Sequence, residues 1–338
     1  MTLATLRIRA LVLALRLPDA VIRPLVRVPG RIDGQPLDLR TRWFLTLLQV
    51  DRVAHHTLPV AQQRAEIDLV ERSTAAPVRP VRITPSSLPL PGRELGLRVY
   101  TPPEVRVRPG LLYLHGGGWV TGCAEGYDAL CARLALDADC VVLSLDYRLA
   151  PEHPWPAAID DAEQAFVAIR SAAETWGVDP DRLAVGGDSA GGNLAAIVAN
   201  QLGSAAVGAL LLYPGVDLGG EAPSMTLFAE GFFLTRAHIR WFEDQYVPRT
   251  HREDPRVSPL HAAVLGRVPT VVVTAGLDPL RDAGRAYAAR LAAEGVPVDL
   301  LEVPGLVHGF LTLDGVLPAA DAANAAVAER LRALLHPV

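Results

Sequence analysis

Short apolar runs alternate with longer segments of helical periodicity from about residue 97 to the end of the chain. The apolar runs are rich in leucine and valine and predict strands at Leu97–Thr101, Leu111–His115, Val141–Asp146, Leu183–Gly186, Ala209–Tyr213, Val271–Ala275 and Val298–Val303. The longer segments predict helices at residues 156–175, 190–203, 281–294 and 320–335. This alternation is typical of the α/β class, in which helices flank a mostly parallel central sheet. Right-handed crossovers then bring the carboxyl ends of the strands to one edge, where such sheets bind their ligands.

Two stretches, residues 1–80 and 214–268, do not follow this alternation. The second is 55 residues long, far beyond the usual connection between neighbouring elements, so we expect it to hold structure of its own. It contains the aromatic residues Phe228, Phe232, Phe233, Trp241, Phe242 and Tyr246. We therefore expect an N-terminal extension with cap helices in residues 1–80, and a core domain in residues 81–338 with a cap insertion at 214–268. Proline-rich turns at 77–91 and 102–109 predict a hinge between cap and core.

The basic residues exclude several classes of enzyme, because all 32 of them are arginine and the chain contains no lysine. Phosphate-binding loops of the GK[ST] type, Schiff-base enzymes and Ser-x-x-Lys hydrolases all require a lysine, so these classes are excluded. A net charge of −5 provides no broad basic surface for nucleic acid. No uncharged apolar run is long enough to span a bilayer.

The cysteines and the N-terminal residues give evidence on the cellular compartment in which the protein works. Cys123, Cys131 and Cys140 form an odd set without Cys-x-x-Cys spacing, which predicts neither a zinc site nor a disulfide framework and favours the cytoplasm. The first twenty residues share some features with a signal peptide. However, Arg16 interrupts the apolar stretch and no Ala-x-Ala site follows, so a cleaved signal is not expected.

A glycine-flanked serine is the first candidate for chemistry. The sequence from Gly187 to Gly192 reads Gly-Asp-Ser-Ala-Gly-Gly and lies between an apolar run and a helical pattern. A sharp strand-to-helix turn needs glycines for space, and it directs the hydroxyl of Ser189 out at the head of the helix. A glycine-rich turn with a helix-capping serine is the alternative for this motif taken alone.

A second glycine-rich segment, His115 to Trp119, follows the predicted strand Leu111–His115. Gly116, Gly117 and Gly118 leave their backbone N–H groups free to point into a cavity. Together with the N–H of Ala190, which follows the serine, they predict an oxyanion hole for the tetrahedral intermediate of acyl transfer.

A nucleophilic serine needs a base, and the base needs an acid that fixes its tautomer. Asp278 and His308 follow the predicted strands Val271–Ala275 and Val298–Val303, and so stand at the expected edge in the order serine, acid, histidine. His261 is a rival for the base and Asp282 for the acid. Asp282 is expected in the first turn of a helix, where it stabilises the helix dipole.

These segments resemble the hormone-sensitive-lipase family of α/β-hydrolases, specifically its bacterial esterases with HGGG and GDSAG motifs. The resemblance covers about residues 35–335 and rests on five segments: His115–Trp119, Asp146–His153, Gly187–Asn193, Asp278–Asp282 and His308–Phe310. It implies an α/β-hydrolase fold with a helical cap and a triad of Ser189, Asp278 and His308. It also implies that Gly117, Gly118 and Ala190 are the oxyanion donors and that the Asp146 segment braces the site.

The expected function is that of a serine carboxylesterase, with residues 81–338 as its catalytic domain. We expect a small-molecule ester as substrate, with short to medium acyl chains because aromatic residues of the insertion limit the pocket. Trp119, Phe232 and Phe233 are the candidate pocket residues, with Trp119 and one of the two phenylalanines expected as the contacts, whereas most of the other aromatics are expected to form the core of the cap. Amidase or lactonase activity, or ligand binding without catalysis, are the alternatives. No His-Glu-x-x-His or similar cluster occurs, so neither a metal nor another cofactor is expected.

The segment before residue 35 is not required by the family pattern. Residues 1–30 hold five arginines and one aspartate, a local net charge of +4, which would suit an anionic membrane surface. Pro18 and Pro24 interrupt any long amphipathic stripe, so a cap helix or a loose terminus is the favoured interpretation.

Overall fold

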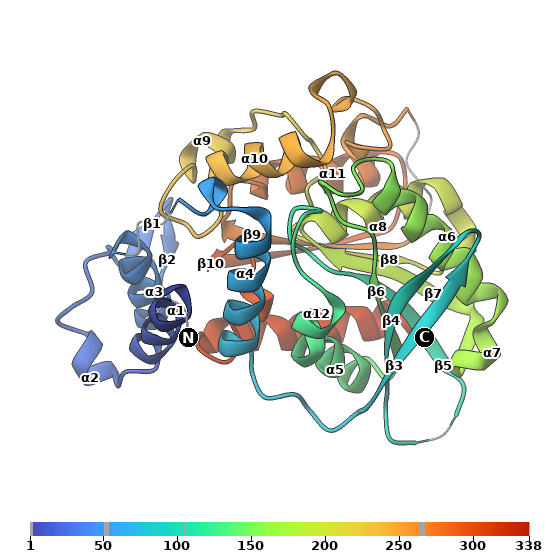
Figure 1. The fold of residues 1–338 in the computed structure, drawn as a ribbon, viewed down its shortest axis with the longest axis horizontal. Helices are drawn as coiled ribbons and strands as arrows, with labels where there is room; N and C mark the ends of the chain where they lie inside the picture. The colour runs from blue at the N-terminus through green and yellow to red at the C-terminus, as the bar shows by residue number, and fades with distance from the viewer. Residues whose placement is uncertain (1–2, 51–53, 105, 264–267, 338) are drawn as a thin grey trace.

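The structure is a computed structural model that describes residues 3–50, 54–104, 106–263 and 268–337. The last residues of the predicted insertion, 264–267, therefore lie outside the described residues. A central sheet is covered by helices on both faces, and a second group of helices lies toward the N-terminal, blue side of the molecule (Figure 1).

The central sheet has eight strands in the order β10-β9-β8-β7-β5-β6-β4-β3. Only β4 runs against its neighbours, pairing antiparallel with both β3 and β6, while the other adjacent strands of this sheet pair parallel. A separate two-stranded ribbon joins β1 (Arg31–Ile32) to β2 (Gln35–Pro36). The strands of the central sheet are β3 (Arg82–Leu90), β4 (Arg93–Thr101), β5 (Arg108–Leu114), β6 (Val141–Asp146), β7 (Val178–Asp188), β8 (Ala209–Leu212), β9 (Thr270–Leu277) and β10 (Val298–Val307).

The helices of the core divide between the two faces of the sheet. One apolar cluster joins the sheet to α6, α8 and α11, and a second joins its other face to α5 and α12. The helices are α1 (Leu3–Leu15), α2 (Asp19–Ile22), α3 (Leu39–Val50), α4 (Val60–Thr74), α5 (Asp128–Asp137), α6 (Ala157–Ser171), α7 (Ala173–Trp176), α8 (Ala190–Leu202), α9 (Pro223–Leu227), α10 (Arg236–Tyr246), α11 (Arg281–Ala293) and α12 (Pro318–Leu335). Short 3-10 turns, η1 to η6, lie at His55–Thr57, Ala124–Tyr127, Gly203–Ala205, Arg249–His251, Pro259–His261 and Phe310–Thr312.

The prediction of an α/β fold with a mostly parallel sheet is confirmed, and every predicted strand and helix coincides with an observed one. The predicted turn at 77–91 is wrong, because Arg82–Leu90 forms the strand β3. Its prolines, Pro85 and Pro89, are accommodated because β3 is the edge strand of the sheet. A proline cannot donate to a ladder, and an edge strand leaves one row of its amides unpaired.

The segments that interrupt the alternation lie over the carboxyl ends of the parallel strands. Helices α1, α3 and α4 from the N-terminal side and α10 from the insertion line one cavity with the loops after β5, β7 and β10. Helix α1 packs on both α3 and α4. Among the described residues, no helix is both long enough and apolar enough to cross a membrane.

Candidate active site

Ser189 stands between the end of β7 and the first residue of α8. Its φ of 53° and ψ of −115° lie in a region that residues with a side chain rarely adopt. The turn brings α8 hard against β5: a Cβ at position 191 would lie 1.8 Å from the carbonyl oxygen of Leu114. Only glycine fits at that position, which explains the second glycine of the motif.

The three residues that the sequence predicts as a triad form one hydrogen-bonded chain. The Oγ of Ser189 lies 2.8 Å from Nε2 of His308, and Nδ1 of His308 lies 2.7 Å from Oδ2 of Asp278. Asp278 is fully buried, and its Oδ1 accepts a hydrogen bond of 2.8 Å from the Leu280 amide. The ring of Tyr213 packs against the His308 imidazole, with centroids 4.6 Å apart. This arrangement fixes both the carboxylate and the imidazole in the orientation that proton transfer from Ser189 requires.

The two rival residues are engaged elsewhere. Nε2 of His261 lies 2.8 Å from Oδ1 of Asp217, and nearly half of the His261 side chain is exposed. Asp282 lies in the first turn of α11, where it pairs with Arg281 and accepts a hydrogen bond from the Ser224 amide.

The glycine loop after β5 supplies two free amides rather than three. The Gly116 amide donates to Oδ1 of Asp188 at 2.8 Å, so Gly116 is not available as an oxyanion donor and that part of the prediction is wrong. Within the described part of the chain, the amides of Gly117, Gly118 and Ala190 donate to no acceptor. Gly118 has a φ of +61°, and a Cβ there would lie 2.2 Å from the ring of Phe242. The cap therefore touches the glycine loop directly.

Asp188, which precedes the nucleophile, holds this loop in place. Besides the Gly116 amide, its carboxylate accepts the hydroxyls of Tyr113 at 2.8 Å and Tyr127 at 3.1 Å. Burial raises the pKa of Asp188 to about 6, although these three donors act in the opposite direction. Asp188 is thus ionised at neutral pH, and its charge orients the loop through Gly116.

His115 supports the same loop from its buried position. Its Nδ1 lies 2.7 Å from the Gly116 carbonyl oxygen, and its ring stacks on Tyr147 with centroids 4.4 Å apart. The Tyr147 hydroxyl donates to the His115 carbonyl at 2.7 Å. Burial lowers the pKa of His115. A structural role for His115 follows from these contacts. The predicted brace, Asp146, accepts a hydrogen bond of 2.7 Å from the Ala124 amide.

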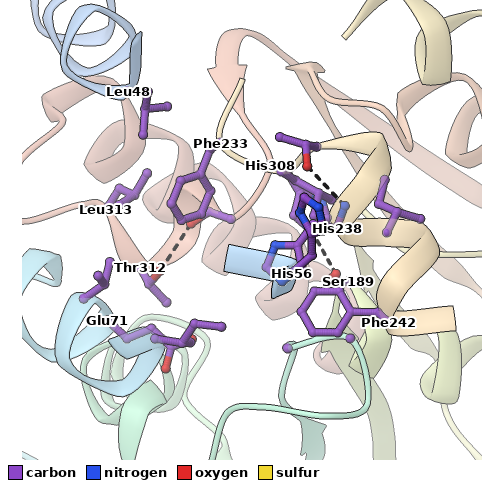
Figure 2. A pocket seen from close by; sticks show the side chains of 18 of the residues that line it. Leu48, His56, Glu71, Ser189, Phe233, His238, Phe242, His308, Thr312 and Leu313 are labelled. Atoms are coloured by element: carbon purple, nitrogen blue, oxygen red, sulfur yellow. Dashed lines mark hydrogen bonds between the residues drawn. The ribbon is translucent and has the colours of Figure 1, made fainter. Parts of the chain in front are cut away.

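A cavity of about 900 Å³ opens beside Ser189. Its volume is at the upper end of the range for small-molecule sites. Phe242 lies close to Ser189, and Phe233 lies between Ser189 and the more distant Leu48 and Leu313 (Figure 2). The far part of the cavity is aliphatic and is lined by Ile8, Leu11, Val12, Leu15, Leu48, Ile67, Val70 and Leu313.

Of the three predicted pocket residues, Trp119 and Phe233 line the cavity and Phe232 does not. Phe232 instead packs edge-on against Phe228, with centroids 5.0 Å apart, and lies partly buried against the apolar core. Phe242 was missed as a pocket residue, although its spacing from Ile239 and Tyr246 is typical of one helix face.

The described residues contain no group of three or more histidine, cysteine, aspartate or glutamate side chains placed to hold a metal ion. The chemistry that the site supports is built from the serine, histidine and carboxylate already described, together with the free amides beside them.

Residues 111–312 match the family described as the alpha/beta hydrolase fold. The chain belongs to this family. Among its relatives, the carboxylic ester hydrolase LipN of Mycobacterium tuberculosis is 43% identical over 297 residues, covering 83% of this chain and 79% of LipN. The ethyl acetate hydrolase of Pseudomonas putida is 40% identical over 252 residues, covering 71% of this chain and 79% of its own.

Solved structures place this α/β-hydrolase among esterases. An ester hydrolase from the metagenome of Lake Arreo superimposes with a TM-score of 0.83 at 42% identity, covering 88% of this chain and 98% of its own. The chain thus belongs to the esterases of the hormone-sensitive-lipase-like branch, as its motifs indicated, and is itself a carboxylic-ester hydrolase. The alternatives of an amidase, a lactonase or a non-catalytic protein are not favoured.

Proposed function

We propose that the protein hydrolyses carboxylic esters through an acyl-enzyme on Ser189. The observation that supports this most directly is the hydrogen-bonded chain from Ser189 through His308 to Asp278, with three free amides beside it. His308 takes the serine proton as Oγ attacks the ester carbonyl carbon, and the amides of Gly117, Gly118 and Ala190 receive the oxyanion. The carbon–oxygen bond to the alcohol then breaks, and the alcohol leaves with the proton from His308. Water repeats the cycle and releases the acid.

We further propose the division into a catalytic domain at 81–338, an N-terminal extension with cap helices at 1–80, and a cap insertion at 214–268. The cavity supports it, because residues of both cap segments face Ser189 across it. A cytoplasmic location is likewise a proposal, supported by three cysteines that are all free thiols.

The cavity supports a preference for acyl chains of short to medium length. An apolar channel gains about 0.8 kcal/mol for each methylene that it buries, which corresponds to about fourfold in kcat/KM for each added carbon. The gain ends where the chain meets Phe233, which lies between Ser189 and the aliphatic end of the cavity (Figure 2). We therefore expect kcat/KM to rise with acyl length, reach a maximum and then fall, when p-nitrophenyl esters of two to sixteen carbons are compared.

Phe233→Ala and Phe232→Ala form a matched pair for this test. Removing the Phe233 ring widens the path from Ser189 toward the aliphatic end of the cavity, so the optimum should move to longer chains. Phe232→Ala should leave the optimum in place, because that ring packs on Phe228. A wild-type profile that still rises at the longest ester, or an optimum that moves only in Phe232→Ala, would contradict the proposal. Small amides and lactones in the same screen test whether ester hydrolysis is the preferred reaction.

We also propose that the outer side of the N-terminal segment associates with anionic membrane surfaces. Residues 1–42 contain eight arginines and three aspartates, a net charge of +5, in a chain whose overall net charge is −5. Leu6, Leu13, Val21 and Leu25 are exposed large apolar side chains in this basic segment. Basic segments with exposed apolar side chains bind the headgroup region of such membranes.

The expected result is co-sedimentation with phosphatidylglycerol vesicles at low salt, and release at high salt because the attraction is screened. Phosphatidylcholine vesicles provide the neutral comparison. Leu13→Ser should weaken binding, whereas Leu300→Ser changes an exposed apolar residue of β10 and should not. Equal sedimentation with both lipids, or none with either, would argue against the association.

A further inference from the structure

Glu71 of the cap helix α4 carries a buried carboxyl group that takes no part in the catalytic triad. Its side chain is among those that line the cavity (Figure 2), and only 7% of the residue is exposed. Among the described residues, none donates a hydrogen bond to Oε2. That oxygen is pressed against η2, since a Cβ at Gly126 would lie 2.5 Å from it. A buried carboxylate oxygen that lacks a donor is costly to ionise, which favours the neutral acid.

The hydroxyl of Tyr127 connects Glu71 with the oxyanion loop. This hydroxyl donates to Oδ2 of Asp188 at 3.1 Å, and it also lies beside the carboxyl group of Glu71. The other carboxylate oxygen of Asp188 accepts the amide of Gly116 at 2.8 Å. Glu71, Tyr127, Asp188 and Gly116 thus form a buried line from the cap to the loop that carries the free amides of Gly117 and Gly118. The single hydroxyl proton of Tyr127 thus has the carboxyl groups of both Glu71 and Asp188 as neighbours.

The charges around Glu71 favour its neutral form. Burial raises the pKa of Glu71 to about 8, and the carboxylates of Asp188 and Asp68 act in the same direction. Arg72 and the Tyr127 hydroxyl act in the opposite direction, but the Arg72 guanidinium is held by Asp68 and by Glu125. The further titratable groups that face this site are Cys123, Tyr127, Tyr147 and Tyr213, and burial raises the pKa of each.

We propose that Glu71 is a positioning residue for ester hydrolysis. When Glu71 is the neutral acid, the Tyr127 hydroxyl donates to Asp188, and Asp188 in turn holds Gly116 and so fixes the position of the oxyanion loop. Ionised Glu71 would place a second carboxylate beside the same hydroxyl. Asp188 would then lose a donor and meet a like charge, and the loop would lose part of its support. The inference rests on the proposed function, because the loop matters only if its amides receive an oxyanion.

The direction of the pH effect follows because the neutral form of Glu71 is the one that supports catalysis. Glu71 is protonated below about pH 8 and ionised above it, so activity should fall as the pH rises through this value. The fall should appear in kcat rather than in KM, because the oxyanion exists only after attack on the ester. Glu71→Gln keeps the shape and the neutral state at every pH. We expect it to retain kcat at pH 7 within about twofold and to lack the decline above pH 8.

Two further variants sharpen the test, which follows kcat and KM from pH 6 to 10 by pH-stat titration. Asp68→Asn removes an exposed carboxylate whose charge raises the pKa of Glu71, so the decline should move to lower pH. Glu302→Gln removes an exposed carboxylate on β10 and should leave the profile unchanged. A decline that persists in Glu71→Gln would overturn the inference, as would an Asp68→Asn profile that moves to higher pH.

Infrared difference spectra provide a readout that does not depend on turnover. Wild type minus Glu71→Gln should show a carboxylic-acid C=O stretch at pH 7 that is replaced by carboxylate bands above pH 8. Carboxylate bands at pH 7 would disprove the neutral form whatever the activity. If instead Ser189→Ala kept its turnover, the proposed function would fail while the infrared result for Glu71 stood, so the two failures are distinguishable.

Discussion

Replacement of Ser189 by alanine is expected to lower kcat for ester hydrolysis by on the order of 10⁴-fold or more, because it removes the hydroxyl that forms the acyl-enzyme. KM should change little, since the walls of the cavity remain. An organophosphate should attach to Ser189 in the wild type, and mass spectrometry of the digested protein should find no adduct in Ser189→Ala. The free amides of Gly117, Gly118 and Ala190 account for residual activity.

Ser189→Gly separates the loss of chemistry from a loss of structure. The φ of 53° strains a side-chain-bearing residue, and glycine adopts this conformation at little cost. The glycine variant should therefore be inactive and yet more stable, by about 1 kcal/mol in the free energy of unfolding by denaturant. Ser204→Ala, in the exposed turn η3, should match the wild type in both measurements. Substantial turnover by Ser189→Ala, or an adduct on a different serine, would assign the nucleophile elsewhere.

The sequence predicts the core sheet well because buried parallel strands are continuous apolar runs. The runs ending at Leu114 and Leu277, for example, are followed directly by the glycine loop and by Asp278. Since the carboxyl ends of these strands share one edge, the order of residues along the chain is enough to predict that Ser189, Asp278 and His308 meet. This reasoning does not predict the strand β3, because Pro85 and Pro89 are typical of turns unless the edge position of the strand is known.

The finer composition of the site depends on contacts that chain order does not encode. Whether Gly116 is a free donor is decided by Asp188, whose carboxylate reaches back from the neighbouring strand and occupies that amide. The aliphatic end of the cavity comes largely from α1, α3 and α4, more than a hundred residues before the nucleophile. In α4, the polar residues Gln63, Glu66 and Glu71 are buried, so the helix does not present an apolar face that would predict its place.

His308→Ala should reduce kcat by an amount similar to Ser189→Ala, because Ser189 then loses the base 2.8 Å from its Oγ. His261→Ala is the matched control: it removes an imidazole that pairs with Asp217 and should leave kcat near that of the wild type. Full activity in His308→Ala together with inactivity in His261→Ala would transfer the role of base to His261.

The same assignment predicts the acid side of the pH profile. A protonated imidazole cannot accept the serine proton, so kcat/KM should fall on acidification. Asp188 adds a second step, because its pKa is raised to about 6: below this pH its carboxylate is protonated and loses acceptor capacity for the Gly116 amide. Two protonations should give a plot of log(kcat/KM) against pH with a slope greater than one below about pH 6. In Asp188→Asn the overall activity should be lower and the slope should return to one, since protonation of the Asp188 carboxylate no longer contributes. A wild-type slope of one throughout would show that the charge of Asp188 does not govern the oxyanion loop.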